Sequence, residues 1–424
     1  MVKNAKIHII AIIVLVGFGI SIAYHYYRGV YLGQPYPYNT FLFFPPAHFS
    51  DYFSVIRDSH SLDPYLEYKS AQYPFLVVLG YLFSLVSSQS YFFYLVVISS
   101  VIFLLGFLYL RNEDWFTNVV PIITITFFNY PFLFTMDRGN FESLLFVFLL
   151  VFLLFYTKKR YLISALFLAF AISMKIYPAI LLVLFISEKK CRALFLCLAS
   201  TAGITFASLL CFKGGFLMNL NFLLRGSNIS SNNQFTQFTS LGSNMVQRGV
   251  TLLTFIKLYY LKTHLLPDLI KNNFSSFYLG LVGILAVAVV LYVIFVEKEE
   301  WKKVALLIFS MLLLPTISAD YKLLHIFIPL YLFINKEHRS KWDILYLLLF
   351  GLLLIPKDYY FFLRIYSDTE GSHDIGIAVV INILVMLIMS ILIMVNGIRN
   401  YFSNRHNKTN VREDTVTKSL NAPG

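Results

Sequence analysis

Long apolar stretches separated by short polar clusters make up most of this chain. We expect the apolar stretches, some of them extended into flanking residues, to form the roughly 20-residue helices that cross a bilayer. They occupy 7–24, 91–110, 119–136, 141–156, 193–212, 277–296, 304–318, 323–335, 342–356 and 375–396. The first has no small-residue cleavage site after it, so we interpret it as an uncleaved span. The pattern predicts an all-α polytopic membrane protein with roughly 10–12 transmembrane helices.

Two apolar segments do not fit a simple span. Counting 73–88 as a span would reverse the side of every later loop, so we place it as an interfacial helix within a long outer loop, 25–90. The segment 161–187 carries Lys175 and Pro178 at its middle. Broken helices occur at membrane depth where they line a cavity. We therefore predict two half-height helices that meet at Lys175–Pro178 and return the chain to its starting side.

The distribution of positive charge supports a topology with both termini inside. On this assignment the inner segments hold 20 of the 34 Lys and Arg residues, as the positive-inside rule predicts. The second large outer loop, 213–276, contains an apolar piece at 250–261 that we expect to be interfacial. We predict one membrane domain over 1–396 and a basic, disordered cytoplasmic tail over 397–424.

Composition excludes several classes of function. The chain is 58% hydrophobic and 13% charged, whereas soluble domains carry about 25% charged residues. The net charge of +12 lies in short clusters at the ends of apolar runs, which argues against a nucleic-acid partner. The three cysteines have no metal-binding spacing. We find no Gly-rich phosphate loop, zinc motif or nucleophile elbow, so nothing indicates nucleotide-sugar chemistry on the inner side.

Four polar clusters fall on the same predicted outer side. A charged side chain inside or beside hydrocarbon costs roughly 3 kcal/mol or more unless it is paired with an opposite charge or serves in binding or catalysis. Four such clusters on one face therefore predict a single active site. Its candidate residues are Asp51, Asp137, Arg138, Asn140, Glu142, Lys175, Tyr177, Asp320, Tyr321, Lys322 and His325.

Each cluster also has a structural interpretation. Asp51 is either a general base or a solvated, helix-capping acid. Asn140 either caps the following helix or belongs to the site. Arg138, between acids, has the fork geometry that binds a phosphate or sugar hydroxyl. Lys175 either snorkels to the interface or contacts a lipid-linked phosphate at the helix break.

The last cluster offers two further cations. Lys322 and His325 are three residues apart, so on a helix they share one face. A single histidine at such a position is more often structural than functional. Because Lys322 lies at the same depth, we give the two interpretations of His325 equal weight. Three carboxylates, from Asp51, Asp137 and Asp320, would make a poor metal cage with cations among them. We therefore expect no obligatory metal or other cofactor.

These clusters, in this order, resemble the signature of glycosyltransferase family 87. The resemblance is carried by Asp137–Glu142, by the cationic turn 158–160 and by Lys175-Ile176-Tyr177-Pro178, with weaker likeness around Asp51 and over Pro315–Pro329. It extends over roughly 1–335. Members are integral-membrane enzymes of the GT-C fold that use polyprenyl-phosphate sugars and include bacterial mannosyltransferases.

The resemblance implies that a hexosyl unit passes from a polyprenyl-phosphate donor to an extracytoplasmic glycan or glycolipid acceptor. It places the enzyme in the bacterial inner membrane, with the active site on the periplasmic side among membrane lipids. The leaving phosphate needs cations, and Arg138, Lys175, Lys322 and His325 are available. Asp51 is the expected base, and one displacement would invert the anomeric configuration.

The donor sugar and the acceptor stay open. Characterised mannosyltransferases of the family tend to carry a Ser-Trp-x-His-His-like run where this chain has Ser318-Ala319-Asp320-Tyr321-Lys322. Glucose is therefore an alternative to mannose, and O-antigen, other lipopolysaccharide parts and cell-wall polymers are all possible acceptors. A transporter or flippase of a lipid-linked sugar, or a polysaccharide polymerase, is the alternative function; the one-sided charge and the scarcity of basic residues outside favour the transferase.

Overall fold

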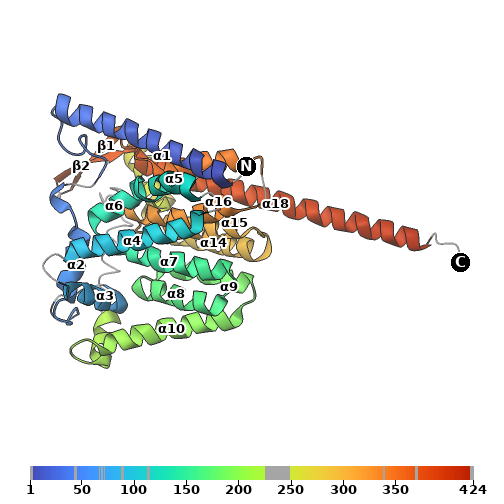
Figure 1. Ribbon diagram of the computed structural model, residues 1–424, viewed down its shortest axis with the longest axis horizontal. Helices are drawn as coiled ribbons and strands as arrows, with labels where there is room; N and C mark the ends of the chain where they lie inside the picture. The colour runs from blue at the N-terminus through green and yellow to red at the C-terminus, as the bar shows by residue number, and fades with distance from the viewer. Residues whose placement is uncertain are drawn as a thin grey trace.

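The computed structural model is a bundle of helices with one small sheet. It describes residues 3–42, 45–65, 67, 70, 72–86, 90–111, 115–224, 249–337, 340–367 and 371–420. The polypeptide runs back and forth between two ends of the bundle, and the long last helix projects beyond one of them (Figure 1). The expectation of an all-α polytopic membrane protein is confirmed.

The helices follow the apolar stretches closely. In the described residues, five are long and apolar enough to span a membrane, or six if a bent pair counts as one span. The long helices are α1 (Lys3–Tyr26, continued by η1 Tyr27–Tyr31), α4 (Ser90–Leu110), α10 (Cys191–Leu210), α14 (Phe274–Phe295) and α18 (Ile377–Leu420). Shorter helices fill the space between them: α7 (Glu142–Thr157), α8 (Tyr161–Met174), α9 (Leu182–Ser187), α15 (Glu300–Leu313), α16 (Phe327–Asn335) and α17 (Asp343–Leu354).

The span expected over 119–136 is bent. It consists of α5 (Trp115–Phe127) and α6 (Tyr130–Arg138), which meet at 49°. Asn129 lies at the break, and its side-chain oxygen accepts a hydrogen bond from the Phe132 backbone N–H at 2.8 Å. Pro131 follows within the first turn of α6, where proline is tolerated. An amide cap and a proline together explain why the helix restarts here.

The segment 161–187 folds as predicted. Helix α8 ends at Met174, Lys175 is extended, and the chain continues through the 3₁₀ helix η3 (Tyr177–Leu181) into α9. Lys190, after α9, lies 4.9 Å from the ring of Tyr161 at the start of α8. The chain has therefore turned back, and Lys175 lies at the tip of a helical hairpin.

The outer loops expected over 25–90 and 213–276 contain further short helices. These are η2 (Pro45–Ala47), α2 (Ser50–Ser59), α3 (Pro74–Ser84), α12 (Leu252–Thr263) and α13 (Asp268–Asn272). Helix α3 matches the helix expected within 73–88, and α12 the piece at 250–261. Residues 225–248 of the second loop lie outside the described residues.

Two features differ from expectation near the C-terminus. Strands β1 (Phe361–Ser367) and β2 (Gly371–Gly376) form an antiparallel pair just before α18. The tail expected to be disordered over 397–424 is helical through Leu420, as a continuation of α18. Helix growth needs no new nucleation once a stable segment exists, so an apolar span can extend into a polar sequence.

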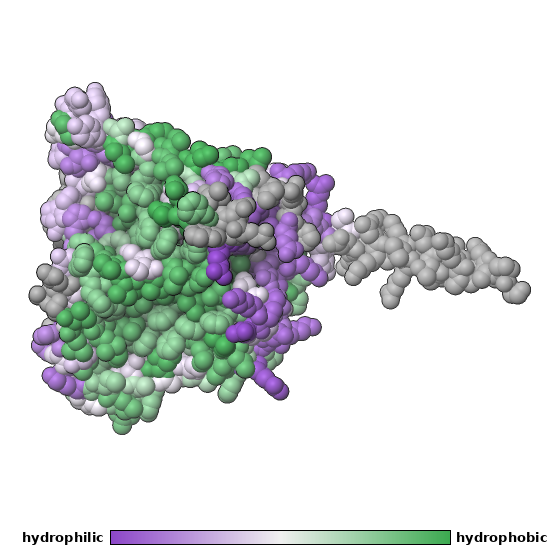
Figure 2. Space-filling model, in the orientation of Figure 1, coloured by the Kyte–Doolittle hydropathy of each residue, from purple (hydrophilic) through white to green (hydrophobic). Residues whose placement is uncertain are grey.

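The surface has the layering of a membrane protein. A broad band of hydrophobic side chains lies between two more hydrophilic edges (Figure 2). One edge lies near α2 and the sheet, and the other lies at the opposite end of the bundle, from which α18 projects (Figures 1 and 2). We call the first edge the site end and the second the basic end, which includes the turns after α7 and α9.

Candidate active site

The predicted polar clusters come together at the site end. The N-terminus of α2 packs against α6, and both α6 and α7 contact the 3₁₀ helix η4 (Asp320–Ile326). The tip of the α8–α9 hairpin reaches the first turn of α7, where Lys175 Nζ lies 2.6 Å from Glu142 Oε1. Four segments far apart in sequence thus supply one polar region.

Asp51 is held by the turn between α6 and α7. Arg138 donates to both of its oxygens, with Nε 3.1 Å from Oδ2 and Nη2 on Oδ1. Asn140 Nδ2 also donates to Oδ2, at 2.7 Å. The side chains of Asp51 and Arg138 are 21% and 17% exposed, so this two-pronged pair still faces the surroundings.

The turn that places Arg138 depends on a glycine. Gly139 ends α6 with φ of +62°, a left-handed conformation that glycine adopts without strain. A Cβ at this position would lie 2.8 Å from Tyr52 Cβ and 3.2 Å from the Phe49 ring. Phe49 N–H in turn donates to the Asp137 carbonyl at 2.9 Å. The α6–α7 turn therefore packs closely on the start of α2, which carries Asp51.

Glu142 is fully buried and is the centre of a second polar group. Its carboxylate accepts from Lys175 at 2.6 Å, from the Tyr177 hydroxyl, and contacts His325 Nε2 at 3.0 Å. Lys322 Nζ lies 4.4 Å from the centre of the Tyr177 ring. Lys175 thus contacts the carboxylate directly and Lys322 lies beside its neighbour Tyr177, so the group keeps an excess of positive charge.

The 3₁₀ geometry of η4 decides which of its side chains join this group. With three residues per turn, positions three apart are eclipsed. Lys322 and His325 therefore share the face toward Tyr177, as their spacing predicted. Asp320 lies on another face and accepts from the Tyr130 hydroxyl at 2.6 Å.

Asn140 joins the two groups. Its amide nitrogen donates to Asp51, while its oxygen accepts from the Glu142 backbone N–H at 2.9 Å. Asn140 therefore both caps α7 and belongs to the site, the two roles that the sequence left as alternatives. Tyr321, between Asp320 and Lys322, has its backbone carbonyl bound by Thr135 of α6 at 2.9 Å.

Two of the predicted site residues point elsewhere. Asp137 pairs with His48, and Asp320 lies beside Tyr130 and lines a small pocket with Asp358 and Asp374. The carboxylates of Asp51, Asp137 and Asp320 thus have different partners and do not converge. Within the described residues no group of three or more His, Cys, Asp or Glu side chains is arranged to hold a metal ion.

Sequence reasoning missed two members of this region. Tyr94, on α4, donates its hydroxyl to the Asn140 carbonyl at 3.0 Å and lies 2.5 Å from Ser143 Oγ. Lys357 is buried 5.9 Å from the Tyr130 ring. A charge directly after the apolar run 342–356 was the available signal for Lys357. No comparable signal marks Tyr94, since tyrosine is abundant throughout this chain.

Comparison with known proteins gives one match. The sequence model of glycosyltransferase family 87 matches residues 72–318, which is more than half of the chain. The matched region contains the α6–α7 turn, the Lys175 tip and all of α7, and it ends just before η4. No curated protein and no solved structure matches the chain.

Proposed function

The chain belongs to glycosyltransferase family 87, and on that premise we propose that it transfers a hexosyl unit from a polyprenyl-phosphate sugar to a hydroxyl of a glycan or glycolipid. Glycosyl transfer follows from the family. The observation that supports this donor is the polar group at the end of an apolar bundle, where Lys175 and His325 contact the carboxylate of Glu142 and Lys322 lies over the adjacent Tyr177 ring.

The charges of this group favour a phosphate ligand. Glu142 holds Lys175 in place and offsets one positive charge, while Lys322 brings a second. A phosphate diester added beside them would balance the excess. The side chain of Lys175 is 20% exposed, so its ammonium is accessible from the surroundings. Polyprenol stays within the bilayer, so a binding group at the edge of the apolar band suits a lipid-linked donor.

In the proposed reaction the acceptor oxygen attacks the anomeric carbon as the bond to the phosphate oxygen breaks. The electron pair leaves with the polyprenyl phosphate, whose growing negative charge Lys175 and Lys322 stabilise, while His325 holds Glu142 in place. Asp51 takes the proton of the acceptor hydroxyl. Its Oδ1 accepts one hydrogen bond among the described residues, from Arg138, so a lone pair remains for this proton. A single displacement inverts the configuration.

We place the site end on the periplasmic face of a bacterial inner membrane. The basic end would then face the cytoplasm, as the positive-inside rule requires. The acceptor in this proposal is an extracytoplasmic glycan such as an O-antigen. No metal enters the mechanism, and metal independence stays a prediction.

The test is transfer by purified Asp51→Asn protein with labelled polyprenyl-phosphate hexoses. General-base help contributes about 10²- to 10⁴-fold in rate, and we expect a loss of that size in protein that still folds and inserts. Asp268→Asn, at an exposed carboxylate in the first turn of α13, is the matched control and should keep full activity. Transfer by Asp51→Asn at the wild-type rate would remove Asp51 from the role of base.

The same assay separates the alternatives. A flippase would move the labelled lipid between leaflets of a vesicle without forming a new glycosidic bond. A polymerase would consume lipid-diphosphate oligosaccharides rather than lipid-monophosphate hexoses. Product analysis on these three substrates therefore tests the proposed donor class directly.

A further inference from the structure

Two tight turns of the same design lie side by side at the basic end. One joins α7 to α8 and the other joins α9 to α10. In each, a lysine adopts a left-handed conformation, Lys159 at φ +58° and Lys189 at φ +54°. In each, the next residue donates its backbone N–H to the carbonyl five residues earlier, Arg160 to Phe155 and Lys190 to Phe185. These bonds end the preceding helix, and the next helix begins one residue later, at Tyr161 and at Cys191.

The first turns of the two following helices, α8 and α10, therefore lie side by side. Helices α8 and α10 pack along each other, and Lys190 lies over the Tyr161 ring of the first α8 turn. The first backbone N–H groups of a helix have no partner within the helix and carry partial positive charge. Two helix N-termini thus open toward one location, which favours an anion.

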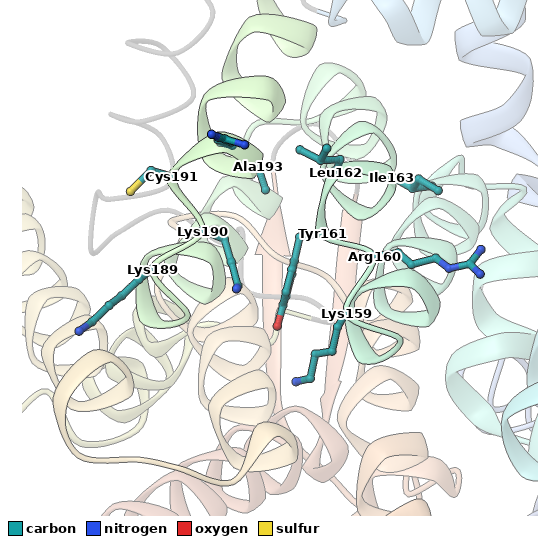
Figure 3. Close-up of a pocket in the computed structure, with 10 residues that line it drawn as sticks. Lys159, Arg160, Tyr161, Leu162, Ile163, Lys189, Lys190, Cys191 and Ala193 are labelled. Atoms are coloured by element: carbon teal, nitrogen blue, oxygen red, sulfur yellow. The ribbon is translucent and has the colours of Figure 1, made fainter.

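A pocket of about 550 Å³ lies between these two helix starts. It is lined by residues of both turns and of the first helical turns, 159–163 and 189–193. Figure 3 shows Leu162 and Ile163 on the α8 side, Cys191 and Ala193 on the α10 side, and Lys159 and Lys190 on either side of Tyr161. Leu162 and Ile163 are 53% and 39% exposed, so the pocket has an open apolar wall as well as cations.

The cations of this pocket are mostly uncompensated. Among the described residues none of four lining cations has a carboxylate within 4 Å: Arg160, Lys189, Lys190 and Arg192. The fifth, Lys159, pairs with Glu300. A second charged pocket of about 400 Å³ at the same end differs, since its Lys302 and Lys336 pair with Glu299 and Asp343. Its other two lining cations, Lys341 and Arg399, have no carboxylate within 4 Å among the described residues, so the first pocket has four such cations and the second has two.

We propose that the pocket between the starts of α8 and α10 binds an anionic phospholipid, with the phosphate of its headgroup among the cations and its acyl chains along Leu162 and Ile163. The exposed apolar wall of Leu162 and Ile163 favours a lipid over a free phosphate. The site is independent of the proposed transferase function. It lies at the opposite end of α8 from Lys175, about 20 Å away for a helix of 14 residues.

The wild-type protein contains a probe for this site and an internal control. Cys191 lines the pocket and is exposed, and Cys211, just beyond the other end of α10, is also exposed. We would measure the alkylation rate of each thiol by mass spectrometry in detergent, with added phosphatidylglycerol. At about ten times the dissociation constant of the lipid, Cys191 should react roughly tenfold more slowly. The rate of Cys211 should not change.

Two parallel additions identify the ligand. Phosphatidylcholine carries the same phosphate without net negative charge and should protect Cys191 far less. Inorganic phosphate should protect it little, because it has no acyl chains for the apolar wall. Equal protection by phosphatidylcholine would overturn the proposal of an anionic lipid site, and full protection by inorganic phosphate alone would reassign the pocket to a soluble anion.

A charge-matched pair of variants completes the test. The triple variant Lys189→Gln, Lys190→Gln, Arg192→Gln should weaken phosphatidylglycerol binding about 100-fold, since each basic residue near an anionic lipid contributes about fivefold. The control removes three cations at the same end but outside this pocket: Lys298→Gln, Lys341→Gln and Arg399→Gln. It should keep near wild-type affinity. Equal losses in both variants would show a general surface-charge effect and overturn the site.

Discussion

The two polar ends of the bundle use positive charge in opposite ways. At the site end Arg138 is paired with Asp51, and Lys175 is paired with Glu142, which is fully buried. At the basic end most cations around the α8–α10 pocket are without a carboxylate in the described part of the chain. The first arrangement fixes side chains in position, whereas the second leaves a net positive surface.

This difference separates two kinds of binding. Paired, buried charges have already lost their hydration, so they can be oriented toward a reacting group without further rearrangement. Unpaired, exposed charges attract any anionic surface and are screened by salt over about 10 Å. The site end is therefore suited to chemistry and the basic end to anchoring against anionic lipid.

We expect the largest difference in stability between the two ends when the carboxylate of Glu142 is removed. In Glu142→Gln the ammonium of Lys175 loses its partner within a buried group, and breaking a buried pair destabilises by about 3–5 kcal/mol. Glu300→Gln removes the partner of Lys159 at the basic end, where the exposed pair contributes about 0–1 kcal/mol. Unfolding in detergent measures both values. Similar losses for the two variants would contradict the contrast between the ends.

The backbone offers a second contrast, of smaller size. Gly139→Ala places a methyl group against Tyr52 at a left-handed position, and we expect about 1–2 kcal/mol of destabilisation together with lower transfer activity. Lys189→Gly at the basic end should change the stability in the opposite direction, because glycine adopts the left-handed conformation without the strain that lysine has there. It should stabilise the fold by about 0.5–1 kcal/mol. Melting temperatures of the two variants test these signs.

A pH series sharpens the view of the site end. Burial lowers the pKa of Lys322 to about 8, and nearby Lys175 lowers it further while Glu142 opposes the shift. Lys322 is therefore charged below pH 8 and loses its proton above it. The KM for the lipid donor should rise by about tenfold or less between pH 7 and pH 9, where roughly 90% of Lys322 is neutral.

Lys322→Arg is the control for this effect. Arginine stays charged throughout the range, so its KM should be flat between pH 7 and pH 9. The same pKa predicts that the free energy of unfolding of the wild-type protein rises from pH 8 toward pH 10.5, because the unfolded chain retains a proton that the folded state releases. A pH-dependent KM in Lys322→Arg would assign the titration to another group.

The sequence predicted the features that depend on local breaks. Pro178 beside Lys175 predicted the helical hairpin, and Gly139 with Asn140 marked the turn that carries Arg138. Glycine, proline and charge inside apolar runs have few structural alternatives at membrane depth. For this reason the bundle and its principal polar cluster were predictable from one sequence.

The partners of the charges were not predictable. Asp51 and Arg138 are 87 residues apart, and nothing local links Asp51 to Arg138 rather than to Lys175. Asp320 was grouped with Lys322 because both lie in the polar run 319–322, but residues two apart point to different sides of a helix, and Asp320 accepts from Tyr130 instead. The helical extension of α18 was also missed, because a polar composition alone resembles that of a disordered tail.

The length of α8 sets the position of Lys175 at the tip of the hairpin. Its 14 residues extend from Tyr161, which packs beneath the Lys190 ammonium, to the residue before Lys175. Inserting one residue would raise the tip by about 1.5 Å and rotate it by about 100°, so that Lys175 would swing out of reach of Glu142. Indels in this helix should therefore be tolerated far less than point changes on its lipid-facing side.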